Sequence, residues 1–223
     1  MMLALMLGSK YSAKKMETSV NATIDYYFAP QSPWTYFGHD RFTAIAKAAN
    51  ATVRILPVDY GQIFPISGGL PLPKRAPQRQ AYRLVELARF RDALNVPMYI
   101  QPKFFPVASD DAARLIIAVD LNDGVDAAMR ISGAVFRAVW EQEMDIANPD
   151  ALSVLLAQCG LVANRLELSR GKPVQDKFQA NTQAAIAANV FGAPSYVVDG
   201  EIFWGQDRLE FLQRRLLRRS TSA

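Results

Sequence analysis

The chain has 223 residues, and half of them are hydrophobic, which suffices for a buried core and excludes a disordered protein. Its 25 basic and 21 acidic residues leave a net charge of only +4, a weak argument for nucleic-acid binding. Much of the excess lies at the end of the last predicted helix, where cations complement the helix dipole: Arg214, Arg215, Arg218 and Arg219. No stretch is long and apolar enough to predict a membrane span.

The single cysteine, Cys159, excludes an intramolecular disulfide and favours a reducing compartment, so we expect a cytoplasmic protein. Cys159 follows an apolar helical pattern and is interpreted as a small core residue. Residues 1–20 are expected to form a disordered leader, because their short apolar run lacks the preceding basic residues of a signal peptide.

The first predicted elements are a strand, a helix and a second strand. Residues 22–28 are rich in β-formers, an apolar face recurs from Trp34 to about Ala49, and residues 52–57 form the next strand. This order predicts parallel strands joined by a crossover helix. The glycines and prolines of Gly61 to Pro77 predict a long loop, either functional or a plain linker.

Between residues 78 and 188 apolar residues recur at helical spacing, which predicts a block of helices. Their expected positions are Tyr82 to Leu94, Ala112 to Val119, 127–140, 151–158, 164–169 and 173–189. The aromatic turn Phe104-Phe105-Pro106 between the first two is expected to be a packed loop.

The C-terminal part carries the most information. Gly192-Ala193-Pro194 precedes a predicted hairpin of strands 195–198 and 201–204 with a tight turn at Asp199-Gly200. Pro194 lacks an N–H, so it belongs at a strand start or edge, and the main-chain groups of Ala193 are left free to bind a ligand. We predict a cis Ala193–Pro194 bond, which would point these groups outward. A helix then begins at Gln206 or Asp207, with Asp207 interpreted as its cap.

The order of these elements resembles a thioredoxin fold split by a helical domain. It predicts an α/β, thioredoxin-like fold interrupted by a large all-α helical insertion. Residues 21–60 and 190–220 would form the thioredoxin-like domain, and residues 61–189 the helical insertion domain.

Phe191-Gly192-Ala193-Pro194 together with the segment Phe203 to Leu209 resembles the 2-hydroxychromene-2-carboxylate isomerases and the related kappa-class glutathione transferases, over residues 23–218. The resemblance implies glutathione as the cofactor and a small aromatic substrate. It implies reversible addition of the glutathione thiolate to an aromatic α-keto acid system, as in aromatic degradation. The oligomeric state stays open, with a homodimer as one alternative.

Ser32-Pro33-Trp34-Thr35 lies at the junction where thioredoxin-like folds carry Cys-x-x-Cys. Hydroxyls at both cysteine positions exclude thiol–disulfide exchange there. Local sequence alone favours Ser32 as a helix cap, since Ser followed by Pro is typical of a helix start. The resemblance instead places Ser32 beside the glutathione sulfur as the catalytic residue.

The same resemblance implies the remaining contacts of glutathione. Ala193, before Pro194, would bond the cysteinyl backbone, and Gln206 and Asp207 would hold the γ-glutamyl end. Arg79 is a candidate for the glycyl carboxylate, with a solvated helix face as an equal alternative. Relatives carry an Asn beside a Gly where this chain has Ser67-Gly68-Gly69, which leaves that contact open.

Two other functions stay open at this stage. One is a glutathione transferase that releases its adduct, and the other is a thioredoxin-fold binding module that has lost its cysteines. The only histidine, His39, has no evident triad partner and is interpreted as a packing or surface residue. No zinc spacing or P-loop pattern is found, so no metal site is expected.

Overall fold

The computed structural model describes residues 21–221, so the leader expected at residues 1–20 lies outside the described residues. The chain begins with β1 (Thr23–Phe28), α1 (Pro33–Ala48) and β2 (Thr52–Pro57). The two strands are parallel, and Thr23 to Phe28 pair in register with Thr52 to Pro57. The parallel pair predicted from the strand-helix-strand order is therefore confirmed.

The sheet is completed by the predicted C-terminal hairpin. β3 (Ser195–Val198) pairs antiparallel with both β1 and β4 (Glu201–Trp204), which gives the order β2-β1-β3-β4. Asp199 and Gly200 both have positive φ, 50° and 81°, as the tight turn of a two-residue hairpin requires.

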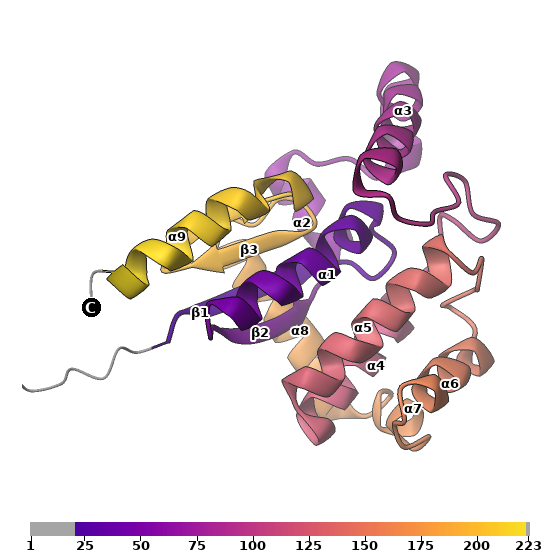
Figure 1. The fold of residues 1–223 in the computed structure, drawn as a ribbon. Helices are drawn as coiled ribbons and strands as arrows, with labels where there is room; N and C mark the ends of the chain where they lie inside the picture. Colours follow the sequence, from indigo (N-terminus) through magenta and orange to yellow (C-terminus); the bar gives the residue numbers. More distant parts are fainter. Residues whose placement is uncertain (1–20, 222–223) are drawn as a thin grey trace, which may run out of the picture.

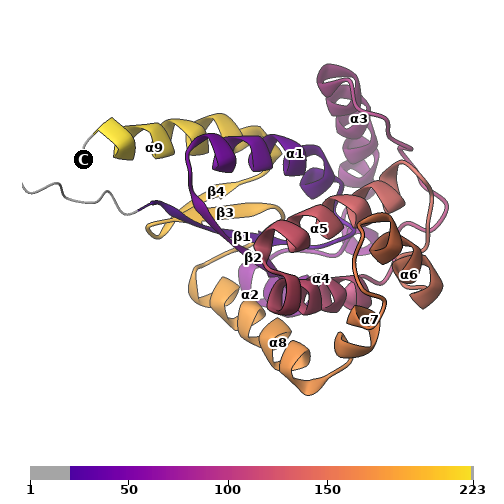
Figure 2. The same ribbon diagram turned by 60° about the horizontal axis from the view of Figure 1, so that its bottom comes forward.

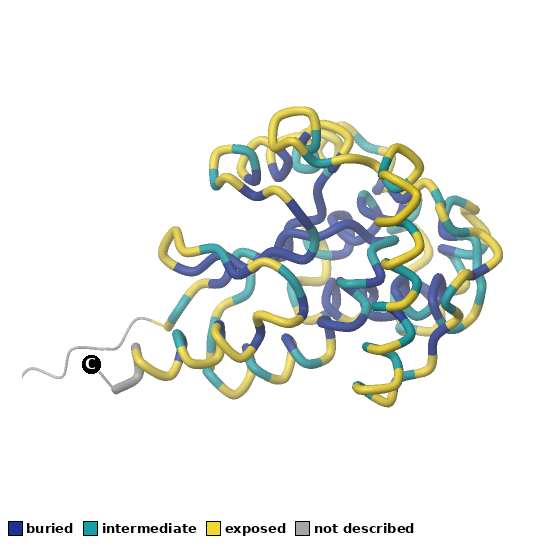
Figure 3. Tube along the Cα trace, turned by 90° about the horizontal axis from the view of Figure 1, so that it is seen from above, coloured by how far each residue is buried: buried dark blue, intermediate teal, exposed yellow. Residues whose placement is uncertain are grey.

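Helices cover both faces of the sheet. α1 and α9 (Leu209–Thr221) lie over one face, while α2 (Tyr60–Ser67) and α8 (Lys172–Ala187) lie over the other (Figures 1 and 2). The strands between these layers form the buried centre of the molecule, seen in dark blue in Figure 3. Aliphatic side chains make up most of this interior, and aromatic rings stack within it, among them the parallel pair of Tyr26 and Tyr196 with centroids 5.3 Å apart.

The helical block contains α3 (Pro77–Leu94), α4 (Asp110–Asp123), α5 (Val125–Trp140), α6 (Pro149–Gln158) and α7 (Arg165–Leu168). α4 and α5 pack against each other and against β2, so the block joins the sheet at that edge strand. α3 stands away from the sheet on the side where α1 begins (Figure 1). Its N-terminal half is largely exposed, and Leu87 is its single fully buried residue.

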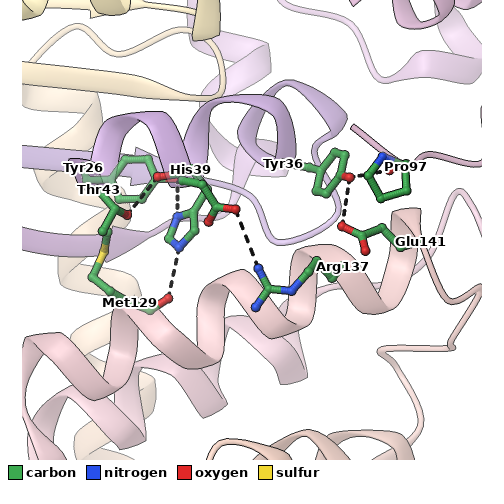
Figure 4. A network of polar contacts seen from close by, with 9 residues as sticks. Tyr26, Tyr36, His39, Thr43, Pro97, Met129, Arg137 and Glu141 are labelled. Atoms are coloured by element: carbon green, nitrogen blue, oxygen red, sulfur yellow. Dashed lines mark hydrogen bonds and ion pairs between the residues drawn. The ribbon is translucent and has the colours of Figure 1, made fainter. Parts of the chain in front are cut away.

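A polar network fixes α1 against α5 (Figure 4). His39 Nε2 lies 3.0 Å from the Met129 carbonyl oxygen, and His39 Nδ1 lies 3.3 Å from the Tyr26 hydroxyl. Because a carbonyl only accepts, Nε2 carries the proton and the Tyr26 hydroxyl donates to Nδ1. Burial lowers the pKa of His39 to about 4, so the ring is neutral at physiological pH. His39 is thus a packing residue.

The prediction of a long loop from Gly61 to Pro77 is wrong. Residues Tyr60–Ser67 form α2, and Leu72–Lys74 form a short 3-10 helix, η1. Asp59 caps α2 by accepting the Gly61 N–H at 2.7 Å, and Gly68 ends the helix with a φ of 76°. Tertiary burial of Tyr60 and Ile63 stabilises a helix that the local glycines and prolines disfavour.

The remaining predicted helices are confirmed within a few residues, while the boundaries assigned to the two domains stay predictions. Within the described part of the chain, no helix combines the length and apolar character that a membrane crossing requires.

Candidate functional site

A cleft of about 990 Å³ is lined by the start of α1, the segment before β3, α2 and α3. It contains every predicted site residue except Pro194: Ser32, Arg79, Ala193, Gln206 and Asp207. These residues come from three distant segments of the sequence. The pairing of β1 with β3 brings Ser32 and Ala193 to the same end of the sheet, and Arg79 comes from α3.

Ser32 is the N-cap of α1, as local sequence predicts. Its Oγ accepts the Thr35 N–H at 3.3 Å, and Pro33 occupies the first helical position. Among the described residues, no acceptor takes the proton of the Ser32 hydroxyl. Ser32 also lines the cleft, so capping leaves the hydroxyl able to donate to a ligand, and the two interpretations are compatible.

The segment before β3 presents unpaired main-chain groups. The Ala193–Pro194 bond is cis, as predicted. The Gly192 carbonyl accepts the hydroxyls of Tyr60 at 2.8 Å and Ser195 at 2.7 Å, and both donors are buried. In the structure as described, the N–H and C=O of Ala193 make no hydrogen bond, and Ala193 faces the cleft. The hydrogen bonds at Gly192 hold this segment in place, and the unpaired N–H and C=O of Ala193 could pair with an extended peptide ligand.

The Gln206 side chain, expected to contact a ligand, is buried at the start of the last helical segment. Gln206 begins the 3-10 helix η2 (Gln206–Arg208), and its side chain is buried, with Oε1 accepting from Arg41 at 2.7 Å. Gln206 Nε2 is buried without a partner, so this side chain retains a donor. Gln206 fits closely over α1, since a Cβ on Gly38 would lie 3.1 Å from the Gln206 Cβ.

Asp207 does not cap the helix that follows it. η2 has no side-chain cap hydrogen bond, and the Asp207 carboxylate instead accepts from Arg208 at 2.6 Å. The Asp207 side chain is 47% exposed and lines the cleft, so it can reach a ligand while keeping its arginine neighbour. The capping role that local sequence favoured is therefore wrong for Asp207.

Aromatic side chains form much of the cleft wall. Trp204 and Phe191 meet edge to face with centroids 4.8 Å apart, and both are partly exposed. Gly192 is required beneath Trp204, because an added Cβ would lie 2.3 Å from its Nε1. Further apolar rings in the wall are Trp34, Phe64, Phe90 and Phe105. Such a surface suits an aromatic ligand.

Three arginines line the α3 side of the cleft: Arg75, Arg79 and Arg83. Of these, only Arg79 was expected at the site. It is exposed, in keeping with either a ligand contact or a solvated helix face. Sequence reasoning missed Arg75 and Arg83, although their four-residue spacing about Arg79 is a signal that could have found them.

Cysteine and metal chemistry receive no support from the described residues. Cys159 ends α6 and is not part of the cleft wall, and burial raises the pKa of its thiol. Across residues 21–221, no three His, Cys, Asp or Glu side chains are grouped to hold a metal ion.

The family model for the DSBA-like thioredoxin domain matches residues 23–217. A 2-hydroxychromene-2-carboxylate isomerase of Sphingobium xenophagum is 27% identical over 197 residues, which cover 87% of this chain and 98% of that protein.

Two solved structures share the architecture. One, of a 2-hydroxychromene-2-carboxylate isomerase, is 24% identical with a TM-score of 0.74 and covers 90% of this chain and 98% of its own. The other is the cytosolic disulfide reductase DsbM of Pseudomonas aeruginosa with GSH, at 19% identity, a TM-score of 0.63, and 87% and 98% coverage. At these identities the likeness shows the fold, and the predicted thioredoxin-like fold with a helical insertion is confirmed.

Proposed function

The chain belongs to the family of DSBA-like thioredoxin domains, and from that premise we propose that it is a glutathione-dependent isomerase of the 2-hydroxychromene-2-carboxylate type. The name of the relative from Sphingobium xenophagum, which aligns over nearly its whole length, supports this choice within the family. The absence of a cysteine at either Ser32 or Thr35 argues against a disulfide oxidoreductase.

One observation carries the proposal. A hydroxyl with a free proton, at Ser32, and the unpaired main-chain groups of Ala193 border the same aromatic-walled cleft. The fit to glutathione is good, because a tripeptide needs extended main-chain partners as well as a donor for its sulfur. Asp207 offers a carboxylate for the α-ammonium group, and Arg79 offers a cation for the glycyl carboxylate.

When bound, glutathione would supply a thiolate that adds reversibly to the conjugated double bond of the substrate, which permits rotation before elimination. Ser32 would donate a hydrogen bond that favours the ionised sulfur. The positive end of the α1 dipole acts in the same direction, since Ser32 begins that helix. Ser32 acts as a donor rather than a nucleophile, because among the described residues no base contacts its hydroxyl.

The cleft also defines how the substrate would be held. The rings of Trp34, Phe105 and Trp204 would offer faces on which an aromatic acid can stack. A cytoplasmic location is part of this proposal, because the cofactor must stay reduced.

The test is an absorbance assay of isomerisation between 2-hydroxychromene-2-carboxylate and its open-chain arylidene pyruvate. We expect turnover to require glutathione in catalytic amounts and to leave it unconsumed. Release of a stable conjugate would identify a transferase instead. Absence of glutathione binding by calorimetry would identify a binding module without this cofactor and refute the proposal.

A further inference from the structure

Arg83 holds a charge in an unusual setting. Its Nη2 is buried and has no hydrogen-bond partner, and its guanidinium carbon lies 4.8 Å from the Phe105 ring centroid and 5.9 Å from that of Trp140. Burial, followed by repulsion from Arg75, lowers the pKa of Arg83 to about 10. An unpaired buried cation is costly unless an anion meets it.

The neighbouring arginines increase this positive charge rather than relieve it. Arg75 donates from Nε to the Leu70 carbonyl at 2.8 Å, and burial and the charge of Arg79 both lower its pKa. Within the described chain, no carboxylate forms an ion pair with Arg75, Arg79 or Arg83.

Other arginines on α3 behave differently. Arg89 pairs with Glu86 at 2.6 Å, and Arg91 pairs with Asp92 at 2.8 Å. Acids are therefore present on this helix, and they pair with the arginines of its C-terminal half. Among the arginines of residues 75–94, those without an ion pair are therefore the three that line the cleft wall.

We infer that Arg83, with Arg75 as a second cation, is the carboxylate subsite for an aromatic acid substrate. A planar guanidinium can bind a carboxylate through two parallel hydrogen bonds, and Arg83 has a buried N–H ready to donate. Phe105 packs on the guanidinium and also lines the cleft. Arg83 could therefore bind the carboxylate of a ligand while Phe105 contacts the attached aromatic ring.

The identification of the acid as the isomerase substrate rests on the proposed function. A second carboxylate, the glycyl group of glutathione, shares the same chemistry. We assign that group to Arg79, which is exposed and better suited to the end of a flexible tripeptide. Arg83 would then act as a specificity residue that selects acids over neutral analogues.

The assignment is tested by titrating trans-cinnamate and the neutral trans-cinnamamide into protein without glutathione, with tryptophan fluorescence as the readout. Trp34 and Trp204 line the cleft and can report binding. In Arg83→Met we expect the Kd of cinnamate to rise by about 10–100-fold, the loss of a hydrogen-bonded charge, with that of cinnamamide unchanged within twofold. Arg83→Lys should lose less. Arg91→Met is the matched control and should bind both ligands as the wild type does.

Calorimetric titration of glutathione into the same variants separates the two sources of carboxylate. Unchanged glutathione affinity in Arg83→Met, together with weakened cinnamate binding, supports the subsite. Weakened glutathione binding with intact cinnamate binding would reassign Arg83 to the cofactor and overturn the inference. No cinnamate binding to the wild type, or equal losses for acid and amide, would also overturn it. A wild type that binds cinnamate through Arg83 but not glutathione would keep the subsite and refute the proposed isomerase.

Discussion

Replacing Arg83 by Met should stabilise the fold while it weakens acid binding. Met is apolar, flexible and able to fill the same path beneath the Phe105 ring, so packing is largely retained. The substitution removes a cation whose Nη2 is buried without a partner. A residue kept for ligand binding at the expense of stability should behave in this way.

The magnitude follows from the pKa of the guanidinium. A value of about 10, against roughly 12.5 for free arginine, corresponds to an unfavourable contribution of about 3 kcal/mol in the charged form. Loss of the cation–π contacts with Phe105 and Trp140 offsets about 0.5–2 kcal/mol of this. We therefore expect a net gain of about 1–2.5 kcal/mol, or a melting temperature higher by about 2–10 °C for a chain of this size.

Calorimetry and urea unfolding at neutral pH, without ligands, measure this gain. Arg91→Met is the control, because Arg91 forms a surface ion pair with Asp92 and its removal should change stability by less than about 0.5 kcal/mol. A clear fall in the stability of Arg83→Met would mean that Arg83 has a structural partner, and the reasoning from an unpaired charge would be refuted.

Three further predictions concern other parts of the molecule. Asp207→Ala should weaken glutathione binding by about 1–3 kcal/mol without lowering the melting temperature, since Asp207 caps no helix; unchanged affinity by calorimetry would remove it from the site. Burial lowers the pKa of His39 to about 4, so between about pH 6.5 and 4 the unfolded imidazole is protonated while the folded one stays neutral. The free energy of unfolding should therefore fall by about 2 kcal/mol when the pH is lowered from 7.5 to 5. Urea titrations of His39→Gln should show a flatter dependence on pH, and an equal slope would contradict this. Gly192→Ala should cost about 1–3 kcal/mol and alter the fluorescence of Trp204, because the added Cβ would lie 2.3 Å from its Nε1; unaltered stability and emission would refute this contact.

Local sequence signals predicted the sheet and most helices well. The strands are short runs of β-formers bounded by Pro and Gly, and the hairpin turn at Asp199-Gly200 has the residues its backbone needs. α2 was missed for a physical reason. Gly61, Pro65 and Gly68 all disfavour a helix locally, and the burial of Ile63 that favours it depends on distant segments.

Local sequence predicted the site only where residue type alone defines a role, while the family resemblance supplied Arg79, Gln206 and Asp207, which also line the cleft. Ser32 before Pro33 signals a helix start, and Ala193 before Pro194 signals free main-chain groups. The partners of a side chain cannot be seen in this way. Gln206 was expected to face a ligand, yet Arg41, 165 residues earlier in the chain, holds its oxygen. The unpaired state of Arg83 likewise depends on which acids the fold brings near it.

The central claim is that Ser32 and the start of α1 stabilise a thiolate in the cleft. The direct test is the ultraviolet absorbance of the thiolate in the glutathione complex, measured against pH in the wild type and in Ser32→Ala. The account predicts a thiol pKa below the ordinary value of about 8.5 in the wild-type complex, and a higher pKa in Ser32→Ala. The isomerisation rate of Ser32→Ala should fall by about 10–1000-fold, while most glutathione affinity remains. The same thiol pKa and the same rate in both proteins would show that Ser32 only caps α1 and would contradict the account.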